Sequence, residues 1–421
     1  MGTQVGFMLL SLVALYDYGA SPKQLGLLSA SNYVPFVVLG LFFGAVIDTR
    51  NPRSVAVTAN TVRLVTIGLM MALYFLGFAN IWSLIVVVLI VAIGSSAYDI
   101  SVQSMVPLVF NRDRITTVNA RFELGRSIGS TLGPAIAGAI VGIWGALSAL
   151  AVLGLTYALG LIGVLSVKTT HTAEGPADRG SSSVKSLVIS IGEGFRYLLG
   201  RTDILAGICL AAVCNLSNGV LAALAFFQLK DLHGFSSEQT GLVGSIAGLM
   251  TIGTALVAGR LARMGSTLAC MVTSLICSSG AALVFSIVPT PLGPPIVFFG
   301  VILGINYSAN QVFNVRMISY RQATVPSQYL ARANSASKSL IMVTLPIGSA
   351  LGGVLASYWS SRVALSSVSI AAILIFLAMA VAARKAPWQD TGLAAQHNDT
   401  RNDHAPDADE GDDTWNGFPV Q

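Results

Sequence analysis

Long apolar stretches separated by short polar loops run along most of the chain. A stretch of about 20 apolar residues is enough for an α-helix to cross the hydrocarbon core of a bilayer. A further, shorter apolar stretch at the start of the chain ends near Tyr18. The pattern therefore predicts an all-α membrane protein with one short first span and eleven clear spans, near residues 24–48, 54–78, 81–108, 118–143, 146–168, 204–230, 237–262, 266–289, 292–318, 330–356 and 362–384.

One block of this pattern occurs twice, 215 positions apart. YGASPKQLGLL begins at Tyr18, and HGFSSEQTGLV begins at His233. A duplication of such long period in an apolar chain predicts two homologous, pseudo-symmetric halves of six helices each. The residues that match in register are Gly19/Gly234, Ser21/Ser236, Gln24/Gln239, Gly26/Gly241, Leu27/Leu242 and Gly44/Gly259.

The same offset predicts a truncated first helix. The seventh span begins near Ile204, so its counterpart would begin before Met1. The first span has at most 17 residues up to Asp17. This is roughly 25 Å of helix against a hydrocarbon core of about 30 Å.

Composition excludes a soluble globular protein. Hydrophobic residues make up 54% of the chain, charged residues only 10%, and the mean hydropathy is +0.72. Soluble domains carry about 25% charged residues. All four cysteines lie in apolar stretches, so we expect buried free thiols rather than disulfides or metal ligands.

The basic residues predict the orientation in the membrane. They are scattered among short loops and not gathered into one patch, which argues against nucleic-acid binding. Loops after even-numbered spans carry most of them, whereas loops after odd-numbered spans carry only Lys23, Lys230 and Arg362. By the positive-inside rule, both termini are cytoplasmic in a multi-pass protein of the inner or plasma membrane.

Polar segments divide the chain into four parts. We expect a first half at 1–168, a cytoplasmic linker at 169–203, a second half at 204–385 and a tail at 386–421. The linker contains apolar residues at helical spacing, which predicts a short helix on the membrane surface. The tail holds eight acidic residues and one basic residue, which predicts disorder.

The second span ends in GAVIDTRNPR, a motif that points to a known family. The motif resembles the loop between helices 2 and 3 of the major facilitator superfamily, where it acts as a gate latch. The resemblance implies gating roles for Gly44, Asp48, Arg50 and Arg53, with Arg112 as the partner of the aspartate. A carboxylate near a helix N-terminus gains about 0.3–1 kcal/mol. A basic loop that only sets topology is the alternative.

The fifth span contains GSTLGPAIAG, preceded by Arg126. The pattern resembles an element that the superfamily's proton-coupled exporters carry, although Ala137 replaces one glycine. A proline-kinked helix with a smooth glycine face could pack and rock against a neighbour. The resemblance favours export over import, with structural packing as the alternative, and the matching residues are Gly129, Gly133, Pro134 and Gly138.

Ionisable residues within spans are candidates for function. Asp99 is the acid expected to lie inside the membrane, with either a proton-carrying role or a role in a cytoplasmic gate. Glu123 and Arg126 could pair on one helix face. The 215-residue offset relates Glu123 to Lys338, which makes them a candidate ion pair across the two halves.

Polar residues in the middle of spans are candidates for a substrate cavity. The superfamily resemblance implies a cavity between the two halves, and its otherwise apolar lining favours an amphiphilic or hydrophobic cargo. Hydrogen bonding between helices is the alternative role for each of these residues. The candidates are Asn32, Tyr33, Asn215, Asn218, Asn306, Tyr307, Asn310 and Gln311.

A last string, VRMISYRQATVPSQYLARANS from Val315, completes the resemblance together with the repeated block. Both resemble the macrolide-efflux and enterobactin-exporter branch of the superfamily. The resemblance implies the 12-helix major facilitator fold and a proton-coupled antiporter that exports small drug-like or siderophore-like compounds, with multidrug efflux as one form of this activity. We expect a monomer that works by alternating access.

Other classes of function fit less well. The chain has no phosphate-binding loop of the ATP-driven pumps, and no metal-ligand spacing or other equipment of an intramembrane enzyme. We therefore expect no enzyme activity, cofactor or metal. A transporter-shaped sensor or a lipid translocator without drug efflux is the alternative.

Overall fold

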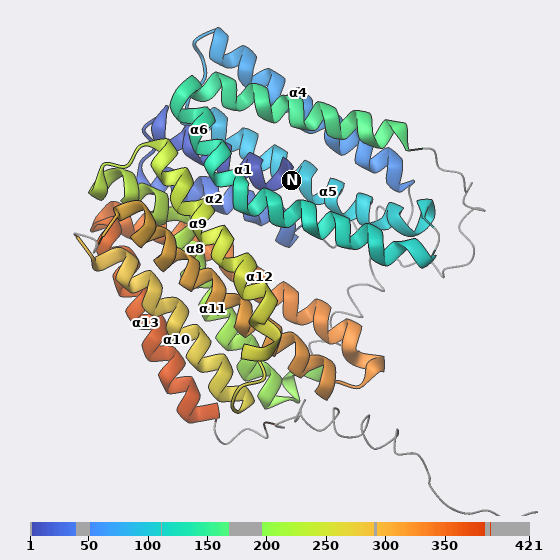
Figure 1. Ribbon diagram of the computed structural model, residues 1–421, viewed down its shortest axis with the longest axis vertical. Coiled ribbons are helices and arrows are strands. Elements are labelled where there is room, and N and C mark those ends of the chain that lie inside the picture. The colour runs from blue at the N-terminus through green and yellow to red at the C-terminus, as the bar shows by residue number, and fades with distance from the viewer. Residues whose placement is uncertain are drawn as a thin grey trace, which may run out of the picture. The chain divides into compact units, whose positions relative to one another are not determined.

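The computed structural model describes residues 2–38, 51–110, 112–167, 196–289, 293–383 and 388. Within these ranges the regular structure is helical, without a strand (Figure 1). The predicted surface helix of the linker, apart from its last residues, and the acidic tail lie outside the described residues, except for Trp388. The elements are α1 (Gly2–Tyr16), α2 (Pro22–Val38), α4 (Pro52–Phe75), α5 (Ile81–Val109), α6 (Arg112–Ser166), α8 (Thr202–His233), α9 (Ser237–Leu261), α10 (Thr267–Ile287), α11 (Pro295–Thr324), α12 (Ser327–Tyr358) and α13 (Ser361–Ala382).

The long element α6 consists of two helices joined at Gly145. The backbone there has φ 72° and ψ −170°, outside the helical region. With α6 counted as two, the described part of the chain holds twelve helices, six in each half. Nine of the described helical elements are long and apolar enough to cross a membrane, whereas α1 has 15 residues. The predicted all-α, twelve-helix architecture is confirmed.

Part of the repeated block encodes helix starts. Backbone amides in a bilayer must be hydrogen-bonded within the protein, and the first amides of a helix have no partner inside it. At α2, Gln24 Oε1 accepts from the Ser21 amide at 2.9 Å and Ser21 Oγ accepts from the Gln24 amide at 3.4 Å. At α9, Ser236 and Gln239 make the same two bonds at 3.0 and 3.4 Å. The duplication thus preserves a reciprocal capping box.

The two halves meet at two helix crossings made by glycines. α2 packs on α12, and α6 packs on α9. A Cβ atom built on Gly26 would lie 2.8 Å from the Cα of Gly353, and one built on Gly138 would lie 3.0 Å from the Cα of Gly241. Because these contacts leave no room for a side chain, only glycine allows the backbones to approach so closely. The offset of 215 converts one glycine pair into the other.

A second set of contacts joins the halves beside these crossings. The Tyr16 hydroxyl donates to the Phe235 carbonyl at 2.8 Å and lies 2.6 Å from Thr240 Oγ1. Lys230 Nζ donates to the Leu15 carbonyl at 2.6 Å and lies 5.0 Å from the centre of the Tyr16 ring. We call these five residues the latch. Crossings and latch lie where α1 ends and α2 begins, which we call the α1–α2 end.

Asp17 supports the latch from the loop after α1. Its Oδ1 accepts from the Ala146 amide at 3.2 Å, at the start of the second helix of α6. Burial raises the pKa of the Asp17 carboxyl above its ordinary value, while this hydrogen bond and the charge of Lys230 act in the opposite direction. Asp17 therefore links the kink of α6 to Lys230.

Candidate functional site

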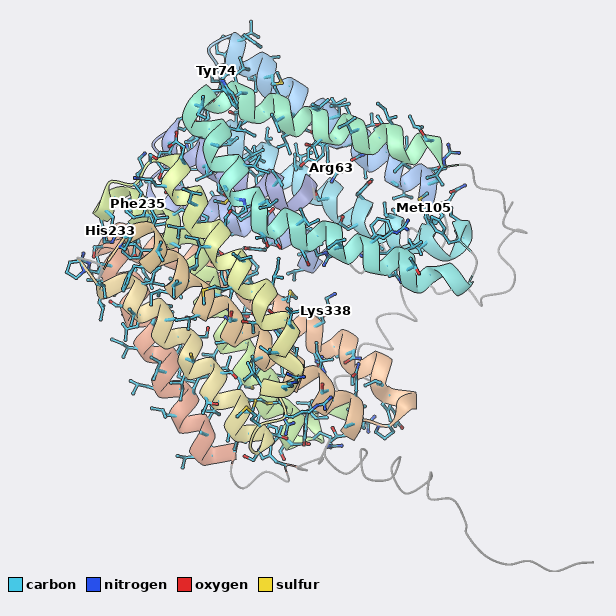
Figure 2. The ribbon with its side chains drawn as sticks, in the orientation of Figure 1. Arg63, Tyr74, Met105, His233, Phe235 and Lys338 are labelled. Atoms are coloured by element: carbon cyan, nitrogen blue, oxygen red, sulfur yellow. The ribbon has the colours of Figure 1, made fainter. Side chains whose placement is uncertain are left out.

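A buried arginine forms the centre of the polar cluster in the N-terminal half. Arg63 lies on α4 with only 3% of its surface exposed. Its Nη1 donates to Ser95 Oγ at 3.1 Å, and its Nη2 donates to Asn60 Oδ1. The guanidinium carbon of Arg63, the residue labelled in Figure 2, lies near two aromatic rings. It is 4.6 Å from the ring centre of Tyr98 and 4.2 Å from that of Tyr157. Hydrogen bonds and two ring faces together offset the cost of burying this charge.

This cluster holds together three helices of the N-terminal half. Asn60, also on α4, donates to the Tyr157 carbonyl of α6 at 3.2 Å. Arg63 contacts α5 through Ser95 and Tyr98, and α6 through the Tyr157 ring. Because the contacts of Arg63 and Asn60 converge on one place, α4, α5 and α6 are joined there by polar side chains within an otherwise apolar bundle.

The candidate acid Asp99 lies directly beside this cluster. It follows Tyr98 on α5 and is half-buried. Arg63 of α4 and Arg126 of α6 both act on its carboxylate electrostatically. Arg126 itself is exposed. Asp99 is thus a carboxylate within a span on which one buried cation and one exposed cation act.

The C-terminal half contains an uncharged polar cluster. Asn310 of α11 accepts from Asn218 Nδ2 at 3.1 Å and from Cys214 Sγ at 2.7 Å. Its Nδ2 donates to Ser278 Oγ of α10 at 2.8 Å. The buried Asn306 also donates to Ser278 Oγ, at 2.9 Å. Asn310 is therefore the hub that joins α8, α10 and α11.

Replacing this hub by an apolar side chain should destabilise the C-terminal half. In Asn310→Leu, Cys214 and Asn218 lose the amide oxygen to which they donate, and Ser278 keeps only its bond from Asn306. Each unsatisfied buried group costs about 1–3 kcal/mol. We expect the midpoint of thermal unfolding in detergent to fall by about 5 °C or more. Asn314→Ala, at an exposed position on the same helix, is the control. Equal midpoints for the two variants would contradict the role of the hub.

Two tyrosines among the predicted cavity residues lie near each other across the halves. Tyr33 of α2 and Tyr307 of α11 lie close enough for a charge on one to affect the other. The ring of Tyr33 is 5.9 Å from that of Phe7, and Tyr307 is 42% exposed. Asn32 is half-buried beside Tyr33. Tyr33 and Tyr307 thus contribute one phenol from each half.

The other predicted cavity residues make contacts within the C-terminal half. Asn215 donates to the Ile341 carbonyl of α12 at 3.0 Å. The buried Asn306 and the hub Asn310 bond Ser278. Gln311 Oε1 is buried and has no hydrogen-bond partner among the described residues. Gln311 thus places a buried acceptor without a partner in this half.

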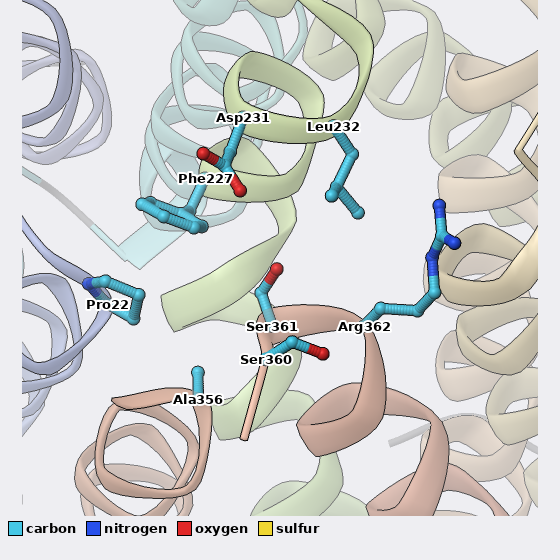
Figure 3. Close-up of a pocket in the computed structure, with 8 residues that line it drawn as sticks. All are labelled: Pro22, Phe227, Asp231, Leu232, Ala356, Ser360, Ser361 and Arg362. Atoms are coloured by element: carbon cyan, nitrogen blue, oxygen red, sulfur yellow. The ribbon is translucent and has the colours of Figure 1, made fainter. Parts of the chain in front are cut away.

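A pocket of about 280 Å³ lies at the α1–α2 end rather than among the predicted cavity residues (Figure 3). Asp231 and Arg362 project from different sides of it. None of the predicted substrate residues lines this pocket, so it is not the predicted substrate cavity. The lining residues are Pro22, Phe227, Asp231, Leu232, Ala356, Ser360, Ser361 and Arg362.

Comparison with known families decides the class of this protein. The model of the Major Facilitator Superfamily matches residues 1–325. The chain belongs to this superfamily. The family resemblance noted in the sequence is thereby confirmed, and both family and fold are those of membrane transporters.

Individual relatives of this superfamily member agree with that assignment. Macrolide efflux protein A of Streptococcus pyogenes is 21% identical over 358 residues, which cover 81% of this chain and 83% of that protein. Macrolide efflux protein A of Enterococcus faecalis is 21% identical over 337 residues, which cover 76% and 97%. The predicted resemblance to macrolide efflux proteins is confirmed at this low identity.

Solved structures show the same fold. A bacterial homologue of the lysosomal transporter Spinster, inward-facing and occupied, matches with a TM-score of 0.67 and 14% identity, over 92% of this chain and 96% of that one. A bacterial homologue of ferroportin, inward-facing, matches with a TM-score of 0.66 and 18% identity, over 90% and 95%. At such identities the likeness concerns the fold alone.

The gating motif of the superfamily is described only at its last position. Arg53 Nη2 donates to the Leu165 carbonyl at 2.6 Å, and its Nε donates to the Val164 carbonyl at 3.3 Å. A cation at a helix C-terminus interacts favourably with the helix dipole. Arg53 therefore binds the end of α6 within the N-terminal half. Gly44, Asp48 and Arg50 lie outside the described residues, as does the side chain of Arg112.

The export-type motif lies on the first helix of α6. Gly138 forms the crossing with Gly241, and a Cβ built on Gly244 would lie 2.8 Å from Pro134 Cβ. The Ala135 amide donates to Ser245 Oγ of α9 at 2.9 Å. Gly129 and Gly133 are buried on the same helix. The motif thus forms the α6 side of one contact between the halves.

The proposed ion pair between Glu123 and Lys338 remains a prediction. Lys338 is exposed on α12 (Figure 2), and the side chain of Glu123 lies outside the described residues.

Arg63 is the site residue that the sequence analysis missed. A signal was present, because an arginine stands ten residues into the third apolar stretch, 54–78. Ionisable residues in spans are functional candidates by default.

Proposed function

We propose that this chain is a proton-coupled secondary transporter that exports small hydrophobic or amphiphilic compounds by alternating access. The observation that carries the proposal is Asp99, a half-buried carboxylate within a span, next to Tyr98 of the Arg63 cluster and within the electrostatic reach of Arg63 and Arg126. The macrolide efflux relatives and the export-type motif on α6 support the direction of transport.

The domain organisation of the proposal follows the duplication. Residues 1–168 and 204–385 form the two halves, and the linker 169–203 and both termini lie in the cytoplasm. This orientation puts the α1–α2 end outside the cell membrane. The crossings and the latch then close the outer side, so the conformation is one that takes up cargo from the cytoplasm. We propose that a single chain is the functional unit.

Proton coupling in this proposal arises because cargo binding and protonation of Asp99 exclude each other. Cargo that enters from the cytoplasm is bound while Asp99 is deprotonated. After the outer side opens, a proton from outside neutralises Asp99 and the cargo leaves. The inward proton gradient therefore drives cargo outward. The hydroxyls of Tyr33 and Tyr307 provide hydrogen-bonding groups for oxygen-rich amphiphiles, with apolar residues around them.

Transport into inverted vesicles tests this proposal. We expect at least one member of a panel of macrolides, dyes and siderophores to accumulate when the vesicle interior is acidified, and an uncoupler to abolish the accumulation. In Asp99→Asn the gradient-driven accumulation should fall about tenfold or more, while exchange of cargo without a gradient persists. If no compound of the panel accumulates with the wild-type protein, a sensor or a lipid translocator is favoured instead. Full gradient-driven accumulation in the variant would remove Asp99 from the mechanism.

A further inference from the structure

The two halves join their third and fourth helices at the same place with different chemistry. In the N-terminal half, Arg63 of α4 donates to Ser95 of α5 at 3.1 Å. In the C-terminal half, Asn310 of α11 donates to Ser278 of α10 at 2.8 Å. The offset of 215 takes Arg63 to Ser278 and Ser95 to Asn310. The two contacts are therefore equivalent. We call each of them the joint between the third and fourth helices of its half; it is charged in the first half and neutral in the second.

The neutral copy shows that this joint does not require a charge. Burying a guanidinium is costly even when it is hydrogen-bonded, whereas buried amides and hydroxyls cost less. The same offset takes Asp99 to Asn314. The cation and the acid thus occur together in one half and are both replaced by neutral residues in the other. This pairing indicates that the charge of Arg63 serves Asp99.

The contacts of Arg63 place it against the turn that carries Asp99. Ser95 lies one helical turn before Asp99, and Tyr98 is its neighbour in sequence. Arg63 contacts both of them, by a hydrogen bond and by its position over the Tyr98 ring. Its Nε has no hydrogen-bond partner among the described residues. The guanidinium therefore fixes the turn while part of its donor capacity remains unused.

Resting on the proposed function, we infer that Arg63 is a positioning residue for proton coupling, which orients Asp99 and favours its deprotonated form. The other described groups that face Asp99 are Tyr98 on its own helix and Arg126 and Tyr157 on α6. Arg126 is exposed, so water and salt screen its charge. Arg63 is buried, so its field reaches Asp99 with less screening.

Exchanging the joint for its neutral copy tests the inference. The variant Arg63→Ser with Ser95→Asn carries the residues that the C-terminal half uses at this joint. The readout is the pH dependence of cargo exchange without a gradient. Loss of a nearby cation makes a carboxylate hold its proton at higher pH. We therefore expect the midpoint of the profile to move up by about one pH unit or more. An unchanged midpoint would overturn the inference.

Single substitutions keep the inference testable if the double variant does not fold. Arg63→Met retains much of the side-chain volume without the charge and should show the same upward shift, whereas Arg63→Lys should keep the wild-type midpoint. Arg316→Met is the matched control, because Arg316 is also buried and bonds Thr267 at 2.6 Å on helices without an acidic residue. Equal shifts in Arg63→Met and Arg63→Lys, or a shift in the control, would contradict the inference.

Failure of this inference can be distinguished from failure of the proposed function. If Asp99→Asn retains the wild-type pH profile, Asp99 is not the coupling group and the proposed mechanism fails. If Asp99→Asn removes the pH dependence and Arg63→Met does not move the midpoint, only the role of Arg63 is wrong. A further variant combining Arg63→Met with Asp99→Asn should behave like Asp99→Asn alone.

Discussion

Gly241→Ala should open the α1–α2 end of the transporter and abolish most of its transport activity. The added Cβ would lie 3.0 Å from the Cα of Gly138 and still closer to the carbonyl oxygen of Pro134. Neither backbone atom can move without shifting a whole helix. Overpacking of this kind costs about 1–3 kcal/mol, which shifts a two-state equilibrium about 5- to 150-fold. The clash occurs only in the closed conformation, where the backbones of α6 and α9 are in contact. The substitution should therefore raise the population of the open conformation.

The measurement is the distance between spin labels at Lys23 and Tyr358, which are exposed at this end on different halves. A longer distance is expected in Gly241→Ala, together with a loss of cargo accumulation of about tenfold. Gly253→Ala is the matched control on the same helix, since nothing lies within 4 Å of its added Cβ. A wild-type distance in Gly241→Ala would show that the crossing tolerates a methyl group.

The symmetry of the crossings gives a second version of this test. Gly26→Ala should act on the α2–α12 crossing as Gly241→Ala acts on the α6–α9 crossing, since a Cβ on Gly26 would lie 2.8 Å from the Cα of Gly353. Similar effects at both positions would show that the halves separate as units. An effect at only one position would indicate that the two crossings open independently.

The sequence predicted the number of helices and the duplication because both depend on local patterns. Apolar stretches of sufficient length must be helical in a bilayer, and capping residues such as Ser21 and Gln24 act within four positions of each other. The match between Gly26 and Gly241 also followed from the sequence. Their function did not, because the partners Gly353 and Gly138 lie on other helices, far away in the chain.

The polar clusters show why the candidate site was harder to predict. The sequence identifies Asn218, Asn306 and Asn310 as polar residues within spans, but not the direction of each side chain. In the structure these amides bond one another or Ser278. For Arg63, the deciding facts are two aromatic rings from different helices. Hydrophobic patterns give no register between helices, so such a cluster appears only once the packing is known.

The latch lies close to the axis that relates the two halves, and its position explains its asymmetry. Lys230 donates to the carbonyl of Leu15. Leu15 is the residue of the first half that is equivalent to Lys230, because the two are 215 positions apart. A contact between equivalent residues can occur only near the symmetry axis. Because the two equivalent residues meet each other, the contact is not symmetric: the second half supplies the cation, and the first half supplies a carbonyl and the Tyr16 ring.

Lys230→Met should therefore weaken the closed α1–α2 end by itself. The substitution removes the hydrogen bond to the Leu15 carbonyl and the interaction with the Tyr16 ring, while the apolar stem remains. Hydrogen bonds of charged groups contribute about 1.5–3 kcal/mol, so the closed population should fall about 10- to 150-fold relative to the open one. The labels at Lys23 and Tyr358 report the change.

Combining Lys230→Met with Tyr16→Phe separates the latch from the glycine crossings. Tyr16→Phe removes the bonds to Phe235 and Thr240 but keeps the ring that Lys230 faces. If the latch acts as a unit, the effect of the two substitutions together is smaller than the sum of their separate effects. Asp231→Asn, one residue after Lys230, is the control and should leave the label distance unchanged. If Lys230→Met also leaves it unchanged, the glycine crossings alone hold this end closed and Lys230 serves only the charge balance around Asp17.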